Sequence, residues 1–307
     1  MRTLSTENAA RRTHRSRDVT AESLKNYLYF WDTYTLYATV HPAAELHTHT
    51  TASITISLDD PFTLEAAGAP AREYRAVFVP PGVEHRVTSP RIRRVVVQLE
   101  PGSPLFYQLG WLLAASGPTA LDIHQFQIPF EELRAILAPA FRGRLTCDEA
   151  HFMFFQTLRA ITGGPATGPA SEGLRDSRVA QILKELRAMR ELPAGLSAGD
   201  LARSVNLSTE HFRHLFKAEM GLPVRRYLLW LRIRRAGIAV AAGVSLTEAA
   251  HSVGFYDSAH LSRTCKEMLG FPPSFLTGRY VEMINCAAGN ETADAIVRTG
   301  APVVGIR

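Results

Sequence analysis

The strongest constraint on this sequence is a near-repeat in its second half. Leu201–Leu207 aligns with Ala249–Phe255 at an offset of 48 residues, from 201 to 249. Further along, Phe212–Lys217 aligns with Leu261–Lys266 at an offset of 49, from 212 to 261. Two copies are too few for a solenoid, so the pattern predicts a duplicated structural unit.

Each copy is predicted to form a helix, a tight turn and a second helix. In the first copy, Leu201, Ala202 and Val205 form an apolar stripe with helical spacing. Asn206 follows where the chain must turn, and Asn tolerates a positive φ better than most residues do. Ser208 is then a suitable N-cap for the second helix. These signals predict a helix-turn-helix unit.

The second copy carries the same signals with different residues. Gly254 occupies the turn, Asp257 or Ser258 the cap, and Leu261 and Cys265 the inward face. The second helix of such a unit normally lies in the DNA major groove. The outward faces therefore predict the DNA-contacting residues, which are Thr209, Glu210, Arg213, His214, Lys217, Ser258, Ala259, Ser262, Arg263 and Lys266.

The segment between the copies, Val224–Ala241, contains no proline and one glycine. It is predicted to form a single helix, whose 18 residues (224 to 241) would span about 27 Å. One turn of B-DNA is about 34 Å. A helix of this length would hold two recognition helices in successive major grooves on one face of the duplex.

Gly254–Lys266, followed by Gly270–Pro273, resembles the signature of AraC/XylS-type transcription regulators. The resemblance covers about a hundred residues. It implies a non-enzymatic, sequence-specific regulator that binds double-stranded DNA, works with RNA polymerase and responds to a small-molecule effector. Two residues depart from the pattern. Cys265 stands where the family usually carries Phe, which predicts a looser second unit. The acidic Glu210 would either accept a hydrogen bond from cytosine N4 or favour the helix start.

The resemblance also assigns base-reading positions. They fall on Glu210, Arg213 and His214 in the first unit and on Ser258, Ser262 and Arg263 in the second. Arg213 and Arg263 are the strongest candidates, because an arginine can donate two hydrogen bonds to guanine O6 and N7. A phosphate contact remains the alternative for each.

The first third of the chain has the pattern of short strands and turns. Many short strands at regular spacing predict an antiparallel barrel or sandwich. The expected strands are Tyr34–Val40, Ser53–Leu58, Phe62–Glu65, Ala76–Val79 and Ile92–Leu99.

Two segments of this region, Glu45–His49 and Phe78–His85, resemble a cupin, a small jelly-roll barrel. The resemblance implies that His47, His49 and His85 are ligands of a divalent transition metal, since residues i and i+2 of a strand share a face and imidazole suits such ions. Two alternatives remain open. The histidines would line a metal-free effector pocket, or they would hold iron in a dioxygenase-like enzyme fused to the DNA-binding domain.

The metal pattern is incomplete. The glutamate expected in metal-binding cupins falls near Ser53 or Ile54, and neither is a carboxylate. Glu45 has the strand parity to substitute for it.

The whole chain is therefore expected to be an α+β multidomain protein, with a cupin-like antiparallel β-barrel flanked by helices and a C-terminal all-α domain with two helix-turn-helix units. The helices after the barrel are expected to pair two subunits into a homodimer; the alternative is that they only cover the barrel. The expected divisions are a basic tail (1–20), the barrel (21–100), a helical dimerisation region (101–163), a linker (164–176), the DNA-binding domain (177–280) and an extension without an assigned role (281–307).

Composition adds little beyond these motifs. A net charge of +5 and a pI of about 9.3 permit nucleic-acid binding without proving it. The arginines of the N-terminus precede no apolar core, so no secretory signal is expected, and no apolar run is long enough for a membrane span. The three cysteines are far apart, which favours reduced thiols in a cytoplasmic protein.

Overall fold

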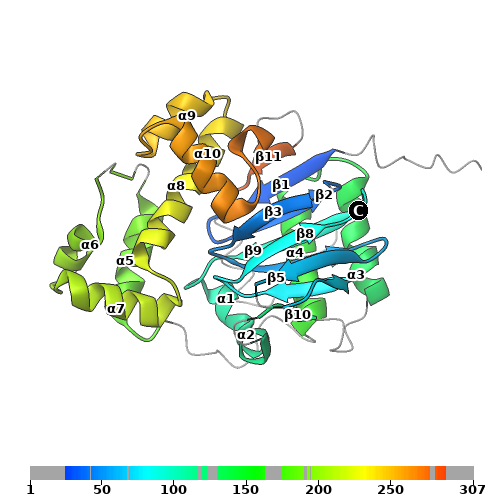
Figure 1. Ribbon diagram of the computed structural model, residues 1–307, viewed down its shortest axis with the longest axis horizontal. Coiled ribbons are helices and arrows are strands. Elements are labelled where there is room, and N and C mark those ends of the chain that lie inside the picture. The colour runs from blue at the N-terminus through cyan, green and yellow to red at the C-terminus, as the bar shows by residue number, and fades with distance from the viewer. Residues whose placement is uncertain are drawn as a thin grey trace, which may run out of the picture.

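The computed structural model describes residues 25–41, 43–67, 69–116, 119–122, 130–162, 174–189, 192–193, 195–276 and 281–287. The predicted basic tail, most of the predicted linker and residues 288–307 lie outside this set. A β-rich part lies beside a helical part (Figure 1). We refer to 25–162 together with 281–287 as the N-terminal domain, and to 174–276 as the C-terminal domain.

The described strands of the N-terminal domain form two sheets. The seven-stranded sheet has the order β10 (Leu121–Asp122), β7 (Ala76–Val79), β4 (Ala52–Ser57), β9 (Arg94–Leu99), β2 (Tyr34–Thr39), β1 (Asn26–Phe30) and β11 (Val281–Asn285). The four-stranded sheet has the order β3 (Ala43–Thr48), β8 (Glu84–Thr88), β5 (Phe62–Ala66) and β6 (Arg72–Tyr74). All five predicted strands are confirmed, and their bounds differ from expectation by at most two residues.

The seven-stranded sheet is buried on both faces, because successive side chains of a strand point to opposite sides. On β9, Val95 and Val97 belong to the large core shared with the helices. Arg94 and Val96, which alternate with them, face a cavity on the side of the four-stranded sheet. The same alternation on β4 leaves every residue of that strand buried.

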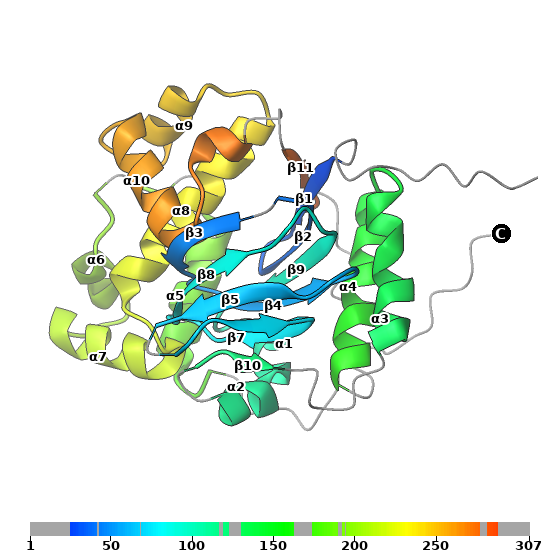
Figure 2. The same cartoon turned by 45° about the vertical axis from the view of Figure 1, so that its right-hand side comes forward.

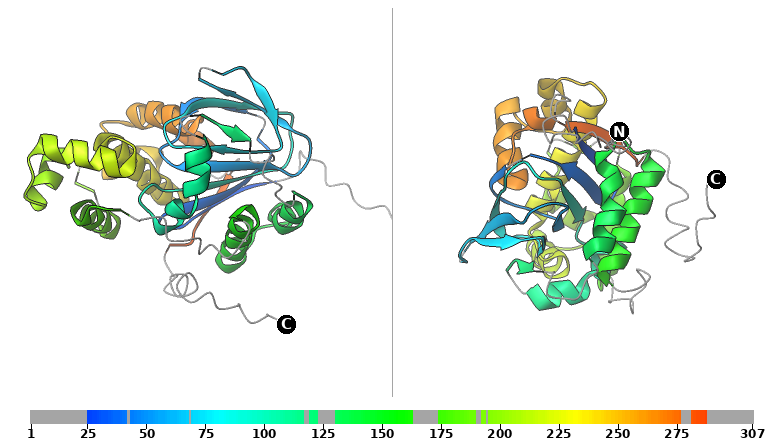
Figure 3. Two further views of the ribbon diagram at one scale, coloured as in Figure 1. Left: turned by 90° about the horizontal axis from the view of Figure 1, so that it is seen from below. Right: turned by 90° about the vertical axis from the view of Figure 1, so that its right-hand side faces the viewer.

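The helices that follow the sheets cover the outer face of the seven-stranded sheet. They are α1 (Pro104–Gln108), α2 (Gly110–Ser116), α3 (Phe130–Leu137), the 3₁₀ helix η3 (Ala138–Phe141) and α4 (Cys147–Thr162). Leu133, Met153 and Phe154 share one apolar core with Ile54 of β4. Figures 2 and 3 show α3 and α4 side by side on this face. The outer side of α4 exposes Phe152, which is 53% accessible.

The C-terminal domain consists of α5 (Ser177–Ala188), α6 (Ala198–Ser204), α7 (Thr209–Met220), α8 (Val224–Ala241), α9 (Leu246–Ser252), α10 (Ser258–Leu269) and the 3₁₀ helix η4 (Pro273–Leu276). Both predicted helix-turn-helix units are confirmed. Asn206 and Gly254 have φ of 55° and 83° at their turns, and Ser208 and Asp257 cap the second helices. The linking helix α8 has the predicted bounds.

None of the helices within the described residues is both long and apolar enough to cross a membrane.

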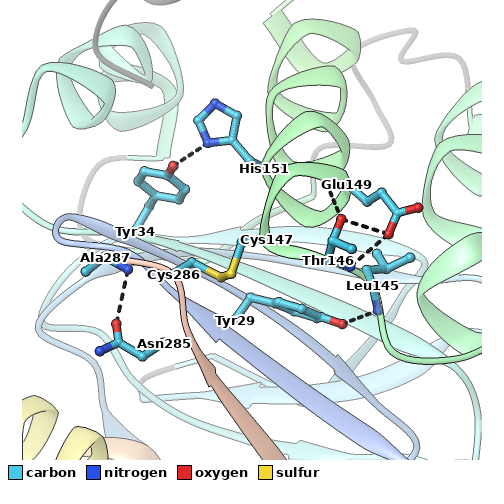
Figure 4. The surroundings of a disulfide bond; sticks show 10 residues. All are labelled: Tyr29, Tyr34, Leu145, Thr146, Cys147, Glu149, His151, Asn285, Cys286 and Ala287. Atoms are coloured by element: carbon cyan, nitrogen blue, oxygen red, sulfur yellow. Dashed lines mark hydrogen bonds between the residues drawn. A yellow bond between two sulfur atoms is a disulfide. The ribbon is translucent and has the colours of Figure 1, made fainter. Parts of the chain in front are cut away.

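The segment after the second unit returns to the N-terminal domain. β11 pairs in parallel with β1, whereas the other strand pairs are antiparallel. Cys286 directly follows β11 and forms a disulfide with Cys147, the first residue of α4, across a Cα–Cα distance of 5.5 Å (Figure 4). The expectation of three reduced thiols is therefore wrong for these two, and Cys265 alone is a free, buried thiol. Strand pairing brings together two cysteines that are 139 residues apart.

Candidate DNA interface and ligand cavity

The first recognition helix, α7, has one buried and one exposed face. The Ser208 hydroxyl accepts a hydrogen bond from the His211 amide at 3.2 Å and so starts the helix. Phe212, Phe216 and Met220 are buried against the domain core. The predicted DNA-contacting residues lie on the opposite side, where Glu210, Arg213, His214 and Lys217 are exposed and Thr209 is half-buried.

The second recognition helix, α10, has the same arrangement with smaller core residues. The Asp257 carboxylate accepts a hydrogen bond from the His260 amide at 2.6 Å. Leu261, Cys265 and Met268 are buried. The predicted contacts again face outward, with Ala259, Arg263 and Lys266 exposed and Ser258 and Ser262 half-buried. The two candidate faces lie toward opposite ends of α8 (Figure 1).

The C-terminal end of α10 rests on strand β3 of the N-terminal domain. The Glu45 amide donates a hydrogen bond to the Gly270 carbonyl at 2.9 Å, and the Lys266 ammonium lies 3.9 Å from the Glu45 carboxylate. Gly270 has φ of 77°, and a Cβ there would meet His47 Nδ1 at 2.7 Å. Only a glycine permits this approach. The sequence signals did not reveal this contact between a recognition helix and a predicted site histidine.

The predicted histidine cluster is present. One ring nitrogen from each of His47, His49 and His85 lies within 4.8 Å of the others, and all three side chains are buried. The Nδ1 atom of His47 lies 2.6 Å from the Glu45 carbonyl oxygen, and that of His85 lies 3.0 Å from the Val83 carbonyl oxygen. Such outer hydrogen bonds leave Nε2 of each ring directed at its neighbours, as in histidine metal sites.

The electrostatics of the cluster favour neutral imidazoles. Burial lowers the pKa of His47 to about 3, and the adjacent His85 contributes to the shift. Burial also lowers the pKa of His49 and of His85. Neutral rings are the form that binds metal ions. The three rings thus fit a divalent transition metal. Glu45 does not complete the site, because it is exposed and faces Lys266 instead.

A cavity of about 140 Å³ lies between the two domains beside this cluster. Its N-terminal wall includes Tyr37, His47 and Arg94. Its C-terminal wall includes Trp230 of α8 and Phe271 after α10. A molecule in this cavity would therefore touch both domains.

A buried polar network holds the domains together near the N-terminal end of α8, one turn before Trp230. The Glu100 carboxylate is 2% exposed. It accepts hydrogen bonds from Arg187 at 3.0 and 3.2 Å and from the Tyr227 hydroxyl at 2.5 Å. Such charge-assisted bonds are strong, and breaking one leaves a buried charge unpaired. The sequence offered no signal for this network, because its members are isolated in the chain.

Comparison with known proteins locates the same domain. A family model described as a helix-turn-helix domain matches residues 201–279. The Msm operon regulatory protein of Streptococcus mutans is 30% identical over 82 residues, which are 26% of this chain and only 30% of that protein. A variant of ToxT from Vibrio cholerae, in its apo form, matches 80% of this chain and 97% of its own with a TM-score of 0.51 and 12% identity, which shows a shared fold.

The exposed recognition helices, the α8 linker and these matches agree. The chain combines a two-sheet N-terminal domain with a C-terminal helix-turn-helix domain, and it shares its fold with ToxT.

Proposed function

We propose that this protein is a transcription regulator that binds double-stranded DNA and is controlled by a small molecule. One observation carries the proposal: two capped helix-turn-helix units lie at opposite ends of an 18-residue helix with both recognition faces exposed. That helix spans about 27 Å, which is close to one turn of B-DNA.

In this proposal, base reading centres on Arg213 and Arg263, whose exposed guanidinium groups suit bidentate pairing with guanine. Lys217 and Lys266, one helical turn further along each helix, contact phosphates. The remaining predicted residues of the two faces, which contact the bases or backbone around them, are Thr209, Glu210, His214, Ser258, Ala259 and Ser262.

The interdomain cavity supports control by an effector. Its walls come from both domains, and Gly270 at the end of α10 packs on His47. A ligand that moves His47 or Trp230 would therefore move the second unit relative to the first. Such control requires that the ligand bind two domain arrangements with different affinity.

The histidine cluster supports a second element of the proposal, a divalent transition metal held by His47, His49 and His85. The ion would supply a Lewis-acidic centre in the wall of the cavity. Without a metal, the three histidines would orient an effector directly through their ring nitrogens. The same cluster favours the alternative function, a dioxygenase-like enzyme. Stoichiometric iron together with turnover would support that alternative; metal without turnover would support the regulator.

We also propose that the protein acts in the cytoplasm as a homodimer that contacts RNA polymerase. The DNA-binding domain supports this location, whereas the expected reduced thiols do not, since Cys147 and Cys286 are bonded. We place this interface on α4, where the exposed Phe152 provides the position at which to test it. Phe152→Ser should shift a dimer toward monomer in analytical ultracentrifugation. A wild-type protein that remains monomeric at all concentrations would contradict the homodimer.

Mapping the sites that the protein occupies across its genome, followed by footprinting of purified protein, tests the main proposal. The expected result is a protected pair of half-sites about one helical turn apart on one face of the duplex. Indifference to duplex DNA at low ionic strength, where phosphate contacts are strongest, would contradict it.

A further inference from the structure

The disulfide between Cys147 and Cys286 encloses the C-terminal domain in a covalent loop (Figure 4). Cys147 begins α4 and Cys286 directly follows β11, so both ends of the bond lie in the N-terminal domain. The 139-residue separation between them includes every described helix of the C-terminal domain, from α5 to η4. The DNA-binding domain is therefore attached at both of its ends for as long as the bond is intact.

Without the bond, β11 would be held by non-covalent contacts alone. Among the described strands it lies at the edge of the seven-stranded sheet, and it pairs only with β1, Val281–Asn285 against Asn26–Phe30. A single strand pair of this length is marginally stable in water, and segments with few partners open locally at a lower free energy than the core. The disulfide is therefore the attachment that decides how readily β11 leaves the sheet.

Strand β11 in turn limits where the second helix-turn-helix unit can lie. Residues 277–280 separate η4 from β11, and a connection of that length spans at most about 18 Å. Met283 of β11 packs on α8, because a Cβ at Gly237 would meet the Met283 Cε at 3.2 Å. Val281 shares an apolar cluster with Phe275 of η4. The second unit therefore stays beside the N-terminal domain while β11 stays in the sheet.

The first unit is held by contacts that do not depend on the disulfide. Arg187 and Tyr227 bind the buried Glu100 carboxylate near the start of α8. Loss of the disulfide would leave this end of the domain in place and release the end that carries α10. At that end Lys266, a predicted phosphate contact, lies 3.9 Å from the Glu45 carboxylate of β3. Release would therefore free this ammonium group and let α10 adjust to a DNA groove.

The two bonded cysteines differ in accessibility. Cys147 is half-buried, whereas Cys286 is only 4% exposed. An external thiol would therefore attack the Cys147 sulfur, and Cys286 would be the leaving group. In a compartment that keeps thiols reduced, a disulfide is ordinarily transient and redox-sensing. A disulfide in a protein that binds DNA is for this reason expected to open and close.

We propose that the Cys147–Cys286 bond is a redox-controlled restraint on the second helix-turn-helix unit. A low-molecular-weight thiol such as glutathione opens it in two exchanges. The first glutathione thiolate bonds to the Cys147 sulfur, and the Cys286 thiolate leaves and takes up a proton. A second glutathione thiolate attacks the bound glutathione sulfur, which yields glutathione disulfide and the Cys147 thiol. The protein gains two electrons and two protons.

The closed bond keeps α10 against β3, and the open bond lets this unit reach its half-site. This inference rests on the proposed DNA-binding function, to which it adds a means of control that needs no ligand in the cavity.

The test equilibrates the full-length protein with different ratios of reduced to oxidised glutathione. Alkylation and mass spectrometry then count the free thiols, and the two cysteines should convert together within the series. The affinity for a duplex that contains both half-sites is measured for each form. The reduced protein should bind about tenfold more tightly, which is within the usual range of coupling between two sites. A bond that stays closed in reduced glutathione, or equal affinity in both forms, would overturn the proposal.

Substitutions assign the effect to this bond. Cys147→Ser and Cys286→Ser should each bind the duplex as tightly as the reduced wild type and should not respond to glutathione. The matched control is Cys265→Ala, because Cys265 is a free thiol, and this variant should keep the full response. A response that is lost in Cys265→Ala and kept in Cys286→Ser would contradict the assignment.

The reduced wild type needs no substitution, so it tests the proposal even where a variant fails to fold. Circular dichroism of this form should show an intact fold. If reduction unfolds the whole protein, the bond is structural and the proposal is wrong.

Two further measurements separate this inference from the DNA-binding function on which it rests. A duplex with only the half-site of the first unit should bind both forms equally, since the open bond releases the second unit alone. Hydrogen exchange, which needs no DNA, should rise on reduction in β11 and α10 and stay unchanged in α7. This exchange pattern without DNA binding in either form would uphold the release of the second unit and contradict the regulator. DNA binding by both forms with unchanged exchange in β11 would do the reverse.

Discussion

The two helix-turn-helix units are alike in backbone and different in surroundings. Both have a serine or aspartate cap, a positive-φ turn and a 12-residue recognition helix that ends at a left-handed glycine. Yet α7 packs two phenylalanines where α10 packs Leu261 and Cys265. At Gly270, the final glycine of the second unit, a Cβ would meet His47 of the N-terminal domain, whereas at Gly221, its equivalent in the first, a Cβ would meet nothing.

This difference indicates that the two units are stabilised in different ways. The first unit is stabilised mainly by its own aromatic core, and it touches the N-terminal domain where Met220 lies against Gly102. The second unit is stabilised partly by contacts with the N-terminal domain. Strand β3 lies against α10, and β11, which follows the second unit in the chain, is connected to α4 by the disulfide. A ligand in the interdomain cavity would therefore act on the second unit more directly than on the first.

The largest expected effect compares the two cores. Phe216→Ala should lower the free energy of unfolding by about 3–5 kcal/mol, because it leaves a large cavity. Cys265→Ala, at the equivalent position of the second unit, should cost only about 1–2 kcal/mol, since far less volume is lost. Urea unfolding followed by circular dichroism measures both. Tyr256→Ala, at a side chain that is 86% exposed, is the control and should change stability by less than about 0.5 kcal/mol. Equal losses at 216 and 265 would mean that the two cores are equally packed.

The next effect concerns the covalent attachment of the second unit. Cys286→Ser should destabilise the protein by about 2–5 kcal/mol, because the bond closes a loop of 139 residues. Hydrogen exchange should rise in β11 and α10 before it rises in α7. Cys147→Ser removes the same bond and should give the same loss of stability. A reducing agent should lower the melting temperature of the wild type and leave that of both variants unchanged. Unchanged melting under reduction would show that strand pairing alone holds β11.

A smaller effect separates the two recognition faces. Arg213→Ala and Arg263→Ala should each weaken the sequence preference at one base pair of the operator. Each should cost about 1–3 kcal/mol of DNA-binding free energy. Binding to a full set of single-base operator variants measures this. Lys217→Ala is the control for a phosphate contact, since it should weaken all sequences alike and reduce the salt dependence by about one ion. A uniform loss for either arginine would assign it to the backbone.

The smallest effect probes the contact between α10 and β3. Glu45→Gln should change stability by less than about 1 kcal/mol, because both partners of the Lys266 ion pair are about half exposed or more. It should also raise DNA affinity slightly by releasing Lys266 for phosphate. Glu131→Gln removes an exposed ion pair with Arg134 within α3, on the outer face of the seven-stranded sheet, and should not affect DNA binding. The same gain in both variants would indicate a general charge effect.

The helical domain was predictable because its signals are local. Caps, turns and apolar spacing act over a few residues, so Ser208, Asn206 and the bounds of α8 followed from the sequence without tertiary information. The histidine cluster was partly predictable, since strand parity places His47 beside His49. His85 needed the resemblance to a known fold to join them.

The sequence by itself determined two DNA-facing helices and the rod between them. Tertiary structure alone decided the return of β11, the Cys147–Cys286 bond and the Glu100 network. Each of these joins or isolates groups that are distant in the chain, and no local preference encodes such a distance.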